Sequence, residues 1–295
     1  MDFLNELYTG LQSMKADLPW MFYAIIFAFA ASFATFLNVV IFRLPYIMDR
    51  EWCEDAEAFL EHKGVKHEQI KRDSLIYSVI GGRSHCTSCK TQIPIYYNVP
   101  ILGWLLLRGK SACCGSRIPF RYLGFELAYT ASVLALFWIF PLITAFYLSA
   151  FLFIALAITA IDMKTTFIPD SLSYGLLWLG LAASLNNIVV SPSEAIVGVI
   201  VSFLALTFVA KFYQLVRGID GMGGGDFKLL AAISAWTGAI GIPYVLLGAC
   251  LLTVIFSLFA GVVRKIPGLN NVKGMPFGPG LAIAGFGYVI YSLLI

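Results

Sequence analysis

Long apolar runs with few charged residues constrain this chain more than any other feature of its sequence. A helix needs about 20 predominantly apolar residues to cross a bilayer. Of the 295 residues, 59% are hydrophobic and 13% are charged, whereas a soluble domain usually carries about 25% charged residues. We therefore expect an all-α polytopic membrane protein with about eight transmembrane helices. The expected helices cover residues 20–42, 122–140, 142–161, 171–190, 194–216, 226–241, 243–263 and 278–295.

The basic residues indicate the orientation of these helices. If the helices alternate from an outside N-terminus, every Lys and Arg except Lys15 lies in or beside four inside loops. Cytoplasmic loops of membrane proteins carry such an excess of positive charge. We expect a multi-pass inner-membrane protein whose first helix is a retained anchor, because this run is too long for a secretory signal. The inside loops are 43–121, 162–170, 217–225 and 264–277.

The same pattern divides the chain into three parts. Residues 1–42 hold the N-terminal segment and the first transmembrane helix, 43–121 form a small cytoplasmic insert, and 122–295 form a seven-helix membrane domain. In the first half of the insert, Trp52 and Phe59 are spaced like one face of a helix. This spacing predicts an amphipathic helix, either solvated or docked on the membrane surface.

Four cysteines lie in the second half of the insert. Cys86 and Cys89 form a CxxC pair, and the adjacent Cys113 and Cys114 follow 24 residues after Cys89. Disulfides are rare in the cytoplasm, and paired thiolates about 20 residues apart are typical of a zinc knuckle. Two adjacent thiolates rarely reach one tetrahedral ion without strain, so both a zinc site and a set of free thiols remain open.

Two aspartates occur where apolar runs meet the inside loops. Asp162 follows some twenty uncharged residues in "AITAIDMKTT", and Asp226 opens the sixth run in "GMGGGDFKLL". The predicted topology places both at the same depth on the same membrane face. Two carboxylates in a poorly solvated site share a proton, and such a pair can activate water and protonate a leaving amine. The alternative is that each acid pairs with a nearby cation, Lys164 or Lys228.

Two further acids have expected roles. Asp170 follows a proline in "FIPDSLSYGLL", at the position of a helix N-cap. Glu126, in "RYLGFELAYT", lies about one turn below the membrane surface. There it snorkels to water or binds a basic group of a substrate.

Gly223, Gly224 and Gly225 precede Asp226 directly. A helix broken by three glycines would expose irregular backbone, which is tolerated at membrane depth only where it lines a wet cavity. Glycine would also let a substrate backbone approach closely. A plain hinge, or the broken helix of a transporter, would have the same composition.

Several of these stretches resemble one family, the type IV prepilin peptidases, and they occur in the family's order over nearly all of the chain after residue 30. The final helix and the segment that carries Asp226 are part of the resemblance. The similar stretches are "ATFLNVVIFRLP", "HCTSC", "NVPILGWLLLRGK", "RYLGFELA", "IDMKTTFIPDSLSYGLLWLGL", "GMGGGDFKLLAAISAWTG" and "PFGPGLAIAG". In two places the chain departs from the pattern: Ala34-Thr35 replaces Gly-Ser, and Ser111 stands where the third cysteine is expected.

The resemblance implies an activity and its residues. Asp162 and Asp226 would be the catalytic pair of a GxGD aspartic endopeptidase, with Gly223 and Gly225 as the motif glycines. Such enzymes remove a basic leader from type IV prepilins or type II secretion pseudopilins, and many then N-methylate the new N-terminal residue with S-adenosylmethionine. Methylation is usually ascribed to the N-terminal part, here the cysteine-bearing insert. No glycine-rich Rossmann loop for S-adenosylmethionine is present in the sequence.

The expected partners are therefore the lipid bilayer and prepilin-like substrates, and nucleic acid is not among them. The alternative function is a membrane transporter or channel, with the glycine-broken helix as an ion site and the aspartates as a proton relay. That alternative predicts internal repeats, of which the sequence gives no convincing sign. The oligomeric state has no signature in the sequence.

Overall fold

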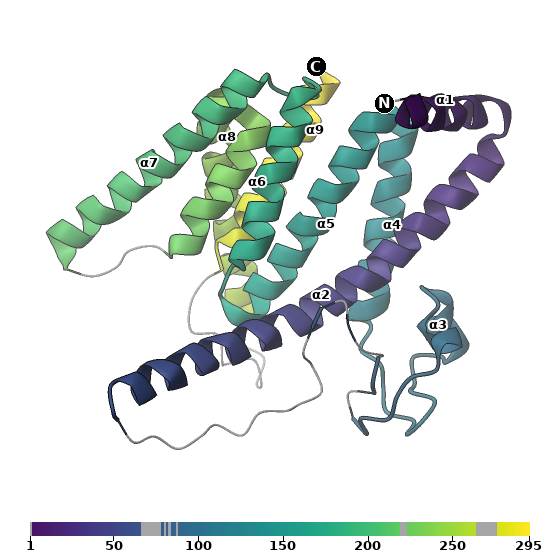
Figure 1. The fold of residues 1–295 in the computed structure, drawn as a ribbon, viewed down its shortest axis with the longest axis horizontal. Coiled ribbons are helices and arrows are strands. Elements are labelled where there is room, and N and C mark those ends of the chain that lie inside the picture. The colour runs from purple at the N-terminus through teal and green to yellow at the C-terminus, as the bar shows by residue number, and fades with distance from the viewer. Residues whose placement is uncertain are drawn as a thin grey trace. The chain divides into compact units, whose positions relative to one another are not determined.

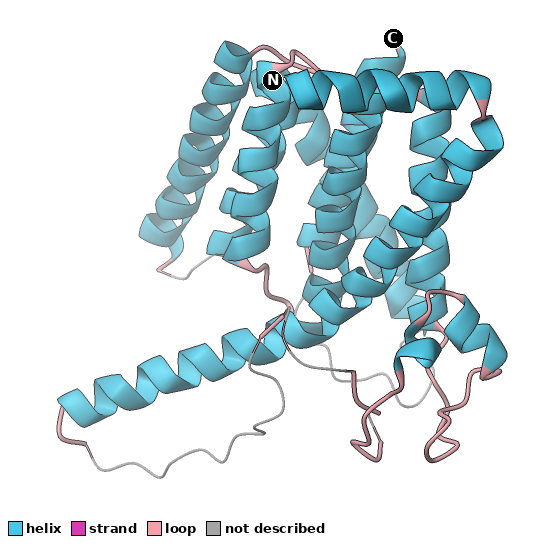
Figure 2. Ribbon diagram, turned by 45° about the vertical axis from the view of Figure 1, so that its right-hand side comes forward, coloured by secondary structure: helices cyan, strands magenta, loops and turns pink. Residues whose placement is uncertain are grey.

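The computed structural model describes residues 2–65, 78–79, 81, 84–86, 88–218, 223–263 and 276–295. Nearly all of the predicted loop 264–277 lies outside these residues, as do Asp220 and part of the insert. Within the described residues the regular structure is helical, joined by loops (Figures 1 and 2). The expected all-α fold is confirmed. The chain forms two compact units, Met1–Ala145 and Phe146–Ile295.

The N-terminal unit is organised around one long helix. α2, Pro19–His62, runs from the first apolar run into the insert without a break, although a boundary was expected at residue 42. It bends partway along (Figure 2), and Pro45 is the proline inside it. The other elements of this unit are α1 (Asp2–Asp17), the 3₁₀ helix η1 (Ile95–Asn98), α3 (Leu102–Leu106) and α4 (Arg121–Ile139).

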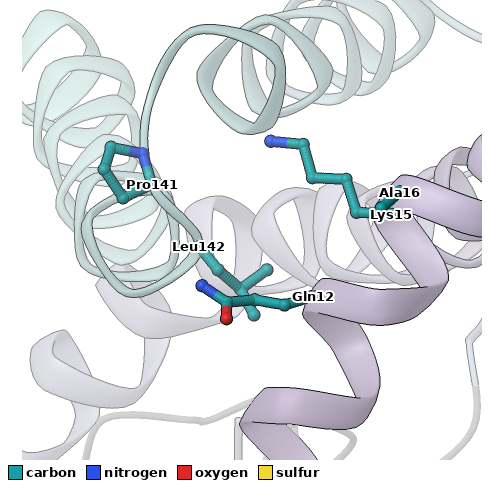
Figure 3. A pocket seen from close by; sticks show the side chains of 5 residues that line it. All are labelled: Gln12, Lys15, Ala16, Pro141 and Leu142. Atoms are coloured by element: carbon teal, nitrogen blue, oxygen red, sulfur yellow. The ribbon is translucent and has the colours of Figure 1, made fainter.

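The apolar first half of α2 packs against α4. Phe22 is fully buried and lies edge-on to Phe137, with 6.2 Å between the ring centroids. Lys15 of α1 donates to the Phe137 carbonyl at 2.7 Å and so satisfies one of the backbone acceptors left open at a helix C-terminus. Gln12 and Lys15 extend toward Pro141 and Leu142 across a hollow of about 310 Å³ (Figure 3). The hydrogen bond from Lys15 therefore ties α1 to the C-terminal end of α4.

The second unit contains the remaining apolar helices, which lie side by side (Figure 1). Its core surrounds Trp236, which is 1% exposed, lies 4.9 Å from the Phe151 ring and donates to the Leu176 carbonyl at 3.1 Å. The elements are α5 (Leu142–Thr165, which begins in the N-terminal unit), α6 (Asp170–Leu185), α7 (Pro192–Arg217), α8 (Gly224–Val263) and α9 (Gly278–Leu294).

The sixth and seventh expected helices form one element, α8, with an internal break. The sequence pattern placed this break at Gly241–Pro243. Instead, the non-helical residue is Gly238, with φ 64° and ψ −177°, a conformation that is essentially restricted to glycine. The backbone angles of one glycine therefore make the break, and Pro243 follows inside the second half.

Five described helices are long and apolar enough to cross a membrane: α2, α4, α5, α7 and most of α8. α9 is apolar but shorter, and α6 has 16 residues. On α7 the buried residues are the small Ala195, Gly198 and Ser202, while large apolar side chains face outward. An outward apolar face is what a lipid-facing helix requires. The chain is a polytopic membrane protein, and the expected number of eight spans stays a prediction.

Candidate functional site: paired aspartates and a cysteine cluster

Asp162 lies near the C-terminal end of α5 and is 3% exposed. Its Oδ2 accepts a hydrogen bond of 3.0 Å from the backbone N–H of Gly278, at the start of α9. A carboxylate in such a buried position needs a donor, because burial without one is costly. The N-terminus of a helix supplies donors that have no partner within the helix. α9 therefore holds the Asp162 carboxylate in place.

Asp226 lies in the first turn of α8, where a negative charge interacts favourably with the helix dipole. Its side chain is half-buried. The Ile168 side chain lies beside both Gly278, which binds Asp162, and Gly225, which precedes Asp226, so the two carboxylates lie in one region of this unit. Two acids that are 64 residues apart in the sequence thus lie in the same part of the second unit.

The glycines before Asp226 differ from the expected broken helix. α8 begins at Gly224, so that Gly224 and Gly225 are helical and Gly223 is the described residue before them. A Cβ on Gly225 would lie 3.1 Å from the Ile168 side chain, whereas one on Gly224 would have no neighbour within 4 Å among the described residues. Gly225 is therefore a packing position, and Gly223 and Gly224 are exposed.

Lys228 does not pair with Asp226. Its ammonium lies 2.5 Å from the carboxylate of Asp170. The expectation that Asp170 caps α6 is wrong, because Pro169 occupies the N-cap and no side chain caps this helix. Asp170 is the first helical residue and ties the start of α6 to the first turn of α8. The cation nearest in sequence to Asp226 is thereby engaged elsewhere.

Gly278 is a site residue that the analysis of side chains missed. Its contribution is a backbone N–H, and a Cβ there would lie 2.7 Å from Asp162 Oδ2. The sequence does carry a signal, since "PFGPG" puts glycine and proline at the start of a helix. Only the fold shows that this helix start meets Asp162.

The four cysteines in the second half of the insert form one cluster. The sulfurs of Cys86, Cys89, Cys113 and Cys114 all lie within 4.8 Å of one another. Cys89 and Cys113 are 3.0 Å apart, and Cys86 and Cys114 are 3.6 Å apart. Sulfurs around a tetrahedral zinc ion lie about 3.8 Å apart, given a Zn–S distance of about 2.3 Å. The adjacent cysteines therefore both reach the cluster, and the set could hold zinc.

Ser111 lies against this cluster at the position where the pattern expects a cysteine. Its hydroxyl donates to Cys86 Sγ at 3.3 Å and lies 3.1 Å from Cys113 Sγ. The backbone N–H of Cys89 and this hydroxyl lower the pKa of the Cys86 thiol to about 5. A thiol with a lowered pKa is present as thiolate, the form that binds metal. Cys113 supplies the fourth sulfur that position 111 lacks.

Glu126 does not snorkel to the surface: it is a buried residue of the N-terminal unit, 9% exposed. The backbone N–H of Ile101 donates to Oε2 at 2.7 Å, and the Thr35 hydroxyl donates to Oε1 at 3.1 Å. The Asn38 amide lies 3.4 Å from Oε1. The carboxylate also lines a cavity of about 750 Å³.

The fold and the site together define a class: a multi-pass helical membrane protein with paired aspartates at the ends of two of its helices. The family described as Bacterial Peptidase A24 N-terminal domain matches residues 28–140, and the Type IV leader peptidase family matches residues 147–258. The chain belongs to the type IV leader peptidase family. No solved structure matches it.

Curated relatives resemble the chain over most of its length. A Dichelobacter nodosus protein is 36% identical, with 90% of each chain covered. An Aeromonas salmonicida protein is 34% identical, with 94% of each covered, and a Legionella pneumophila protein is 33% identical, with 93% of each covered. All three bear the name prepilin leader peptidase/N-methyltransferase.

Proposed function

We propose that this protein is an aspartic endopeptidase of the inner membrane that removes the basic leader from type IV prepilins or type II secretion pseudopilins on the cytoplasmic side. It then N-methylates the new N-terminal residue. The observation that carries the peptidase assignment is the pair of Asp162 and Asp226 at the ends of two apolar helices. The family membership and the names of the relatives support both activities.

The chemistry of cleavage follows from two carboxyl groups around one water. One acid accepts a proton from the water, and the resulting hydroxide adds to the scissile carbonyl. The other acid donates a proton to the leaving nitrogen as the C–N bond breaks. The hydrogen bond from the Gly278 N–H restricts the orientation of the Asp162 carboxylate, which supports this role. Exposed Gly223 and Gly224 leave room for a substrate backbone beside Asp226.

Methyl transfer requires a donor with an activated methyl group, and S-adenosylmethionine supplies one. When bound, it would supply the methyl group of its sulfonium centre to the amine nitrogen of the cleaved substrate, which would lose a proton to water. Zinc held by the four cysteines would order the insert; its role is structural, because four sulfurs fill a tetrahedral coordination shell.

The test is cleavage of a prepilin by the detergent-purified protein beside its Asp162→Asn and Asp226→Asn variants. Either substitution removes an acid/base group at nearly constant size, so we expect cleavage to fall by at least about a thousandfold with the protein still inserted. Asp170→Asn is the matched control: it removes an acid that forms a half-exposed ion pair, worth about 0–1 kcal/mol, and should leave most of the activity.

Two outcomes would contradict the assignment. One is substantial turnover in both variants. The other is absence of cleavage by the wild-type protein with several prepilins. Either would favour the alternative of a transporter or channel, in which the aspartates carry protons.

A further inference from the structure

The N-terminal unit contains a cavity of about 750 Å³, well within the range of ligand sites. It is formed by the middle of α2, the cysteine cluster, the η1–α3 segment and the start of α4. None of its lining residues belongs to the aspartate site.

The buried end of the cavity carries an acid without a cationic partner. The three groups that contact the Glu126 carboxylate, from Thr35, Asn38 and Ile101, are all neutral. No Lys, Arg or His of the described residues forms an ion pair with it. A buried carboxylate is stabilised when a positive charge lies beside it. This end of the cavity is therefore suited to a ligand that brings its own cation.

The walls add aromatic surface. Tyr97 and Trp104, both half-buried, line the cavity. The Trp104 ring lies edge-on to Phe120 at 6.0 Å and donates to the Ile118 carbonyl at 3.4 Å, contacts that fix its position. Rings fixed in this way stack on a purine base and attract a cationic centre near their faces.

Charges of both signs lie on the exposed side of the lining. Asp49 is on α2, and Arg117 follows the cysteine cluster. A group with one ammonium and one carboxylate would find a partner for each. The cavity thus combines a site for a buried cation, a surface for a base and a polar rim for a zwitterion.

We propose that this cavity binds S-adenosylmethionine, with Glu126 facing its cationic part and Tyr97 stacking on its adenine. This inference rests on the methyltransferase half of the proposed function, and it locates the binding site of the methyl donor in the N-terminal unit. A sulfonium nucleoside that ends in an amino acid carries all three features that the lining can recognise. The site has no glycine-rich loop, which explains why sequence motifs do not reveal it.

The test measures equilibrium binding of radiolabelled S-adenosylmethionine to the full-length protein in detergent. Tyr97→Leu removes the stacking surface and should weaken binding about tenfold or more. Tyr96→Leu is the matched control, because Tyr96 is 64% exposed and does not line the cavity; its dissociation constant should equal that of the wild type.

Glu126→Gln keeps the size of the side chain and removes its charge. We expect it to weaken binding of S-adenosylmethionine about tenfold and binding of uncharged 5′-methylthioadenosine by less, because only the former carries a sulfonium. The melting temperature of each variant, measured in the absence of ligand, identifies a variant that is merely unfolded. The difference between the two ligands is a readout that a purely structural role would not produce.

These measurements distinguish a wrong location of the donor site from a wrong assignment of methyltransferase activity. Methylation by the wild type, together with unchanged donor binding in Tyr97→Leu and Glu126→Gln, overturns the location alone. Cleavage by the wild type without methylation or donor binding overturns the methyltransferase and the location together. Unchanged donor binding with a raised KM for prepilin cleavage in both variants shows that the cavity receives peptide, which also overturns the proposal.

Discussion

Gly278 acts in the aspartate site through its backbone. Its N–H donates to Asp162, and the missing side chain leaves the space that the carboxylate fills. The donor is therefore a backbone N–H at the start of α9, and unlike a side chain it has no rotamers to change. Such a fixed donor restricts the orientation of the acid more than a flexible side chain would.

Gly278→Ala should reduce cleavage by about a hundredfold, because a displacement near 1 Å in a catalytic group costs about that much. The added Cβ would lie 2.7 Å from Asp162 Oδ2, so the carboxylate must shift. kcat with a prepilin substrate is the quantity to compare. Gly287→Ala, on the same helix with nothing within 4 Å of its Cβ, is the control and should leave kcat unchanged. Equal kcat in the two variants would contradict the role given to Gly278.

For single residues, the sequence predicts the role of a side chain better than the role of a backbone group. Asp162 and Asp226 could be selected from it because an acid is costly at an apolar helix end, and the structure places them together. The role of Gly278 could not be selected, since every residue except proline has an N–H. The ion pair between Asp170 and Lys228 was likewise beyond prediction, because it depends on how α6 and α8 meet.

Among the elements, α8 shows how one residue divides an apolar run. Its two halves meet at Gly238, whose φ of 64° and ψ of −177° are unsuitable for other residues. The sequence pattern placed the break three to five residues later, because Pro243 is the stronger local signal. Tertiary packing explains the difference: Gly198 of α7 lies so close that its Cβ would be 2.8 Å from the Gly238 carbonyl carbon.

Gly238→Ala should destabilise the second unit by about 1–3 kcal/mol, the cost of holding alanine in this conformation. The result should appear as a lower melting temperature in detergent. Gly175→Ala is a suitable comparison, since Gly175 lies in a regular helix and its Cβ would be 3.8 Å from Ile154. That variant should melt at the same temperature or slightly higher. A Gly238→Ala protein as stable as the wild type would show that the break tolerates a side chain.

The helices themselves were largely predictable. Each of the eight expected ranges begins or ends close to an end of a described helix, because long apolar runs form helices in a bilayer. Two features were not predicted: α1, which has mixed composition, and the continuity of the first apolar helix with the amphipathic helix predicted around Trp52 and Phe59, which together form α2. Polar residues after an apolar run indicate the end of a span, which need not be the end of a helix.

For the whole molecule, the two compact units have different chemistry. The paired aspartates belong to Phe146–Ile295, and the cysteine cluster and the large cavity belong to Met1–Ala145. Their boundary agrees with the boundary between the two matching families, which end at residue 140 and begin at residue 147. The expected division at residue 121 stays a prediction.

Removal of metal should therefore affect one activity more than the other. We expect the purified protein to contain about one zinc ion per chain, and a chelator to reduce methylation and donor binding, because Cys86 and Cys113 line the cavity. Cleavage should be retained. Cys113→Ser should lose the metal, measured by atomic absorption, while Cys250→Ser, an exposed cysteine outside the cluster, should keep it. Full zinc content in Cys113→Ser would show that Ser111 or water can replace this sulfur.

The unbroken course of α2 also gives the large cavity one continuous wall. Its lining residues on this helix extend from Thr35, in the apolar stretch, to Cys53, in the charged stretch, a rise of about 27 Å at 1.5 Å per residue. Because α2 bends partway along, this length follows the course of the helix. The wall that α2 contributes changes from apolar to charged along this length, so a ligand held there would contact both kinds of surface.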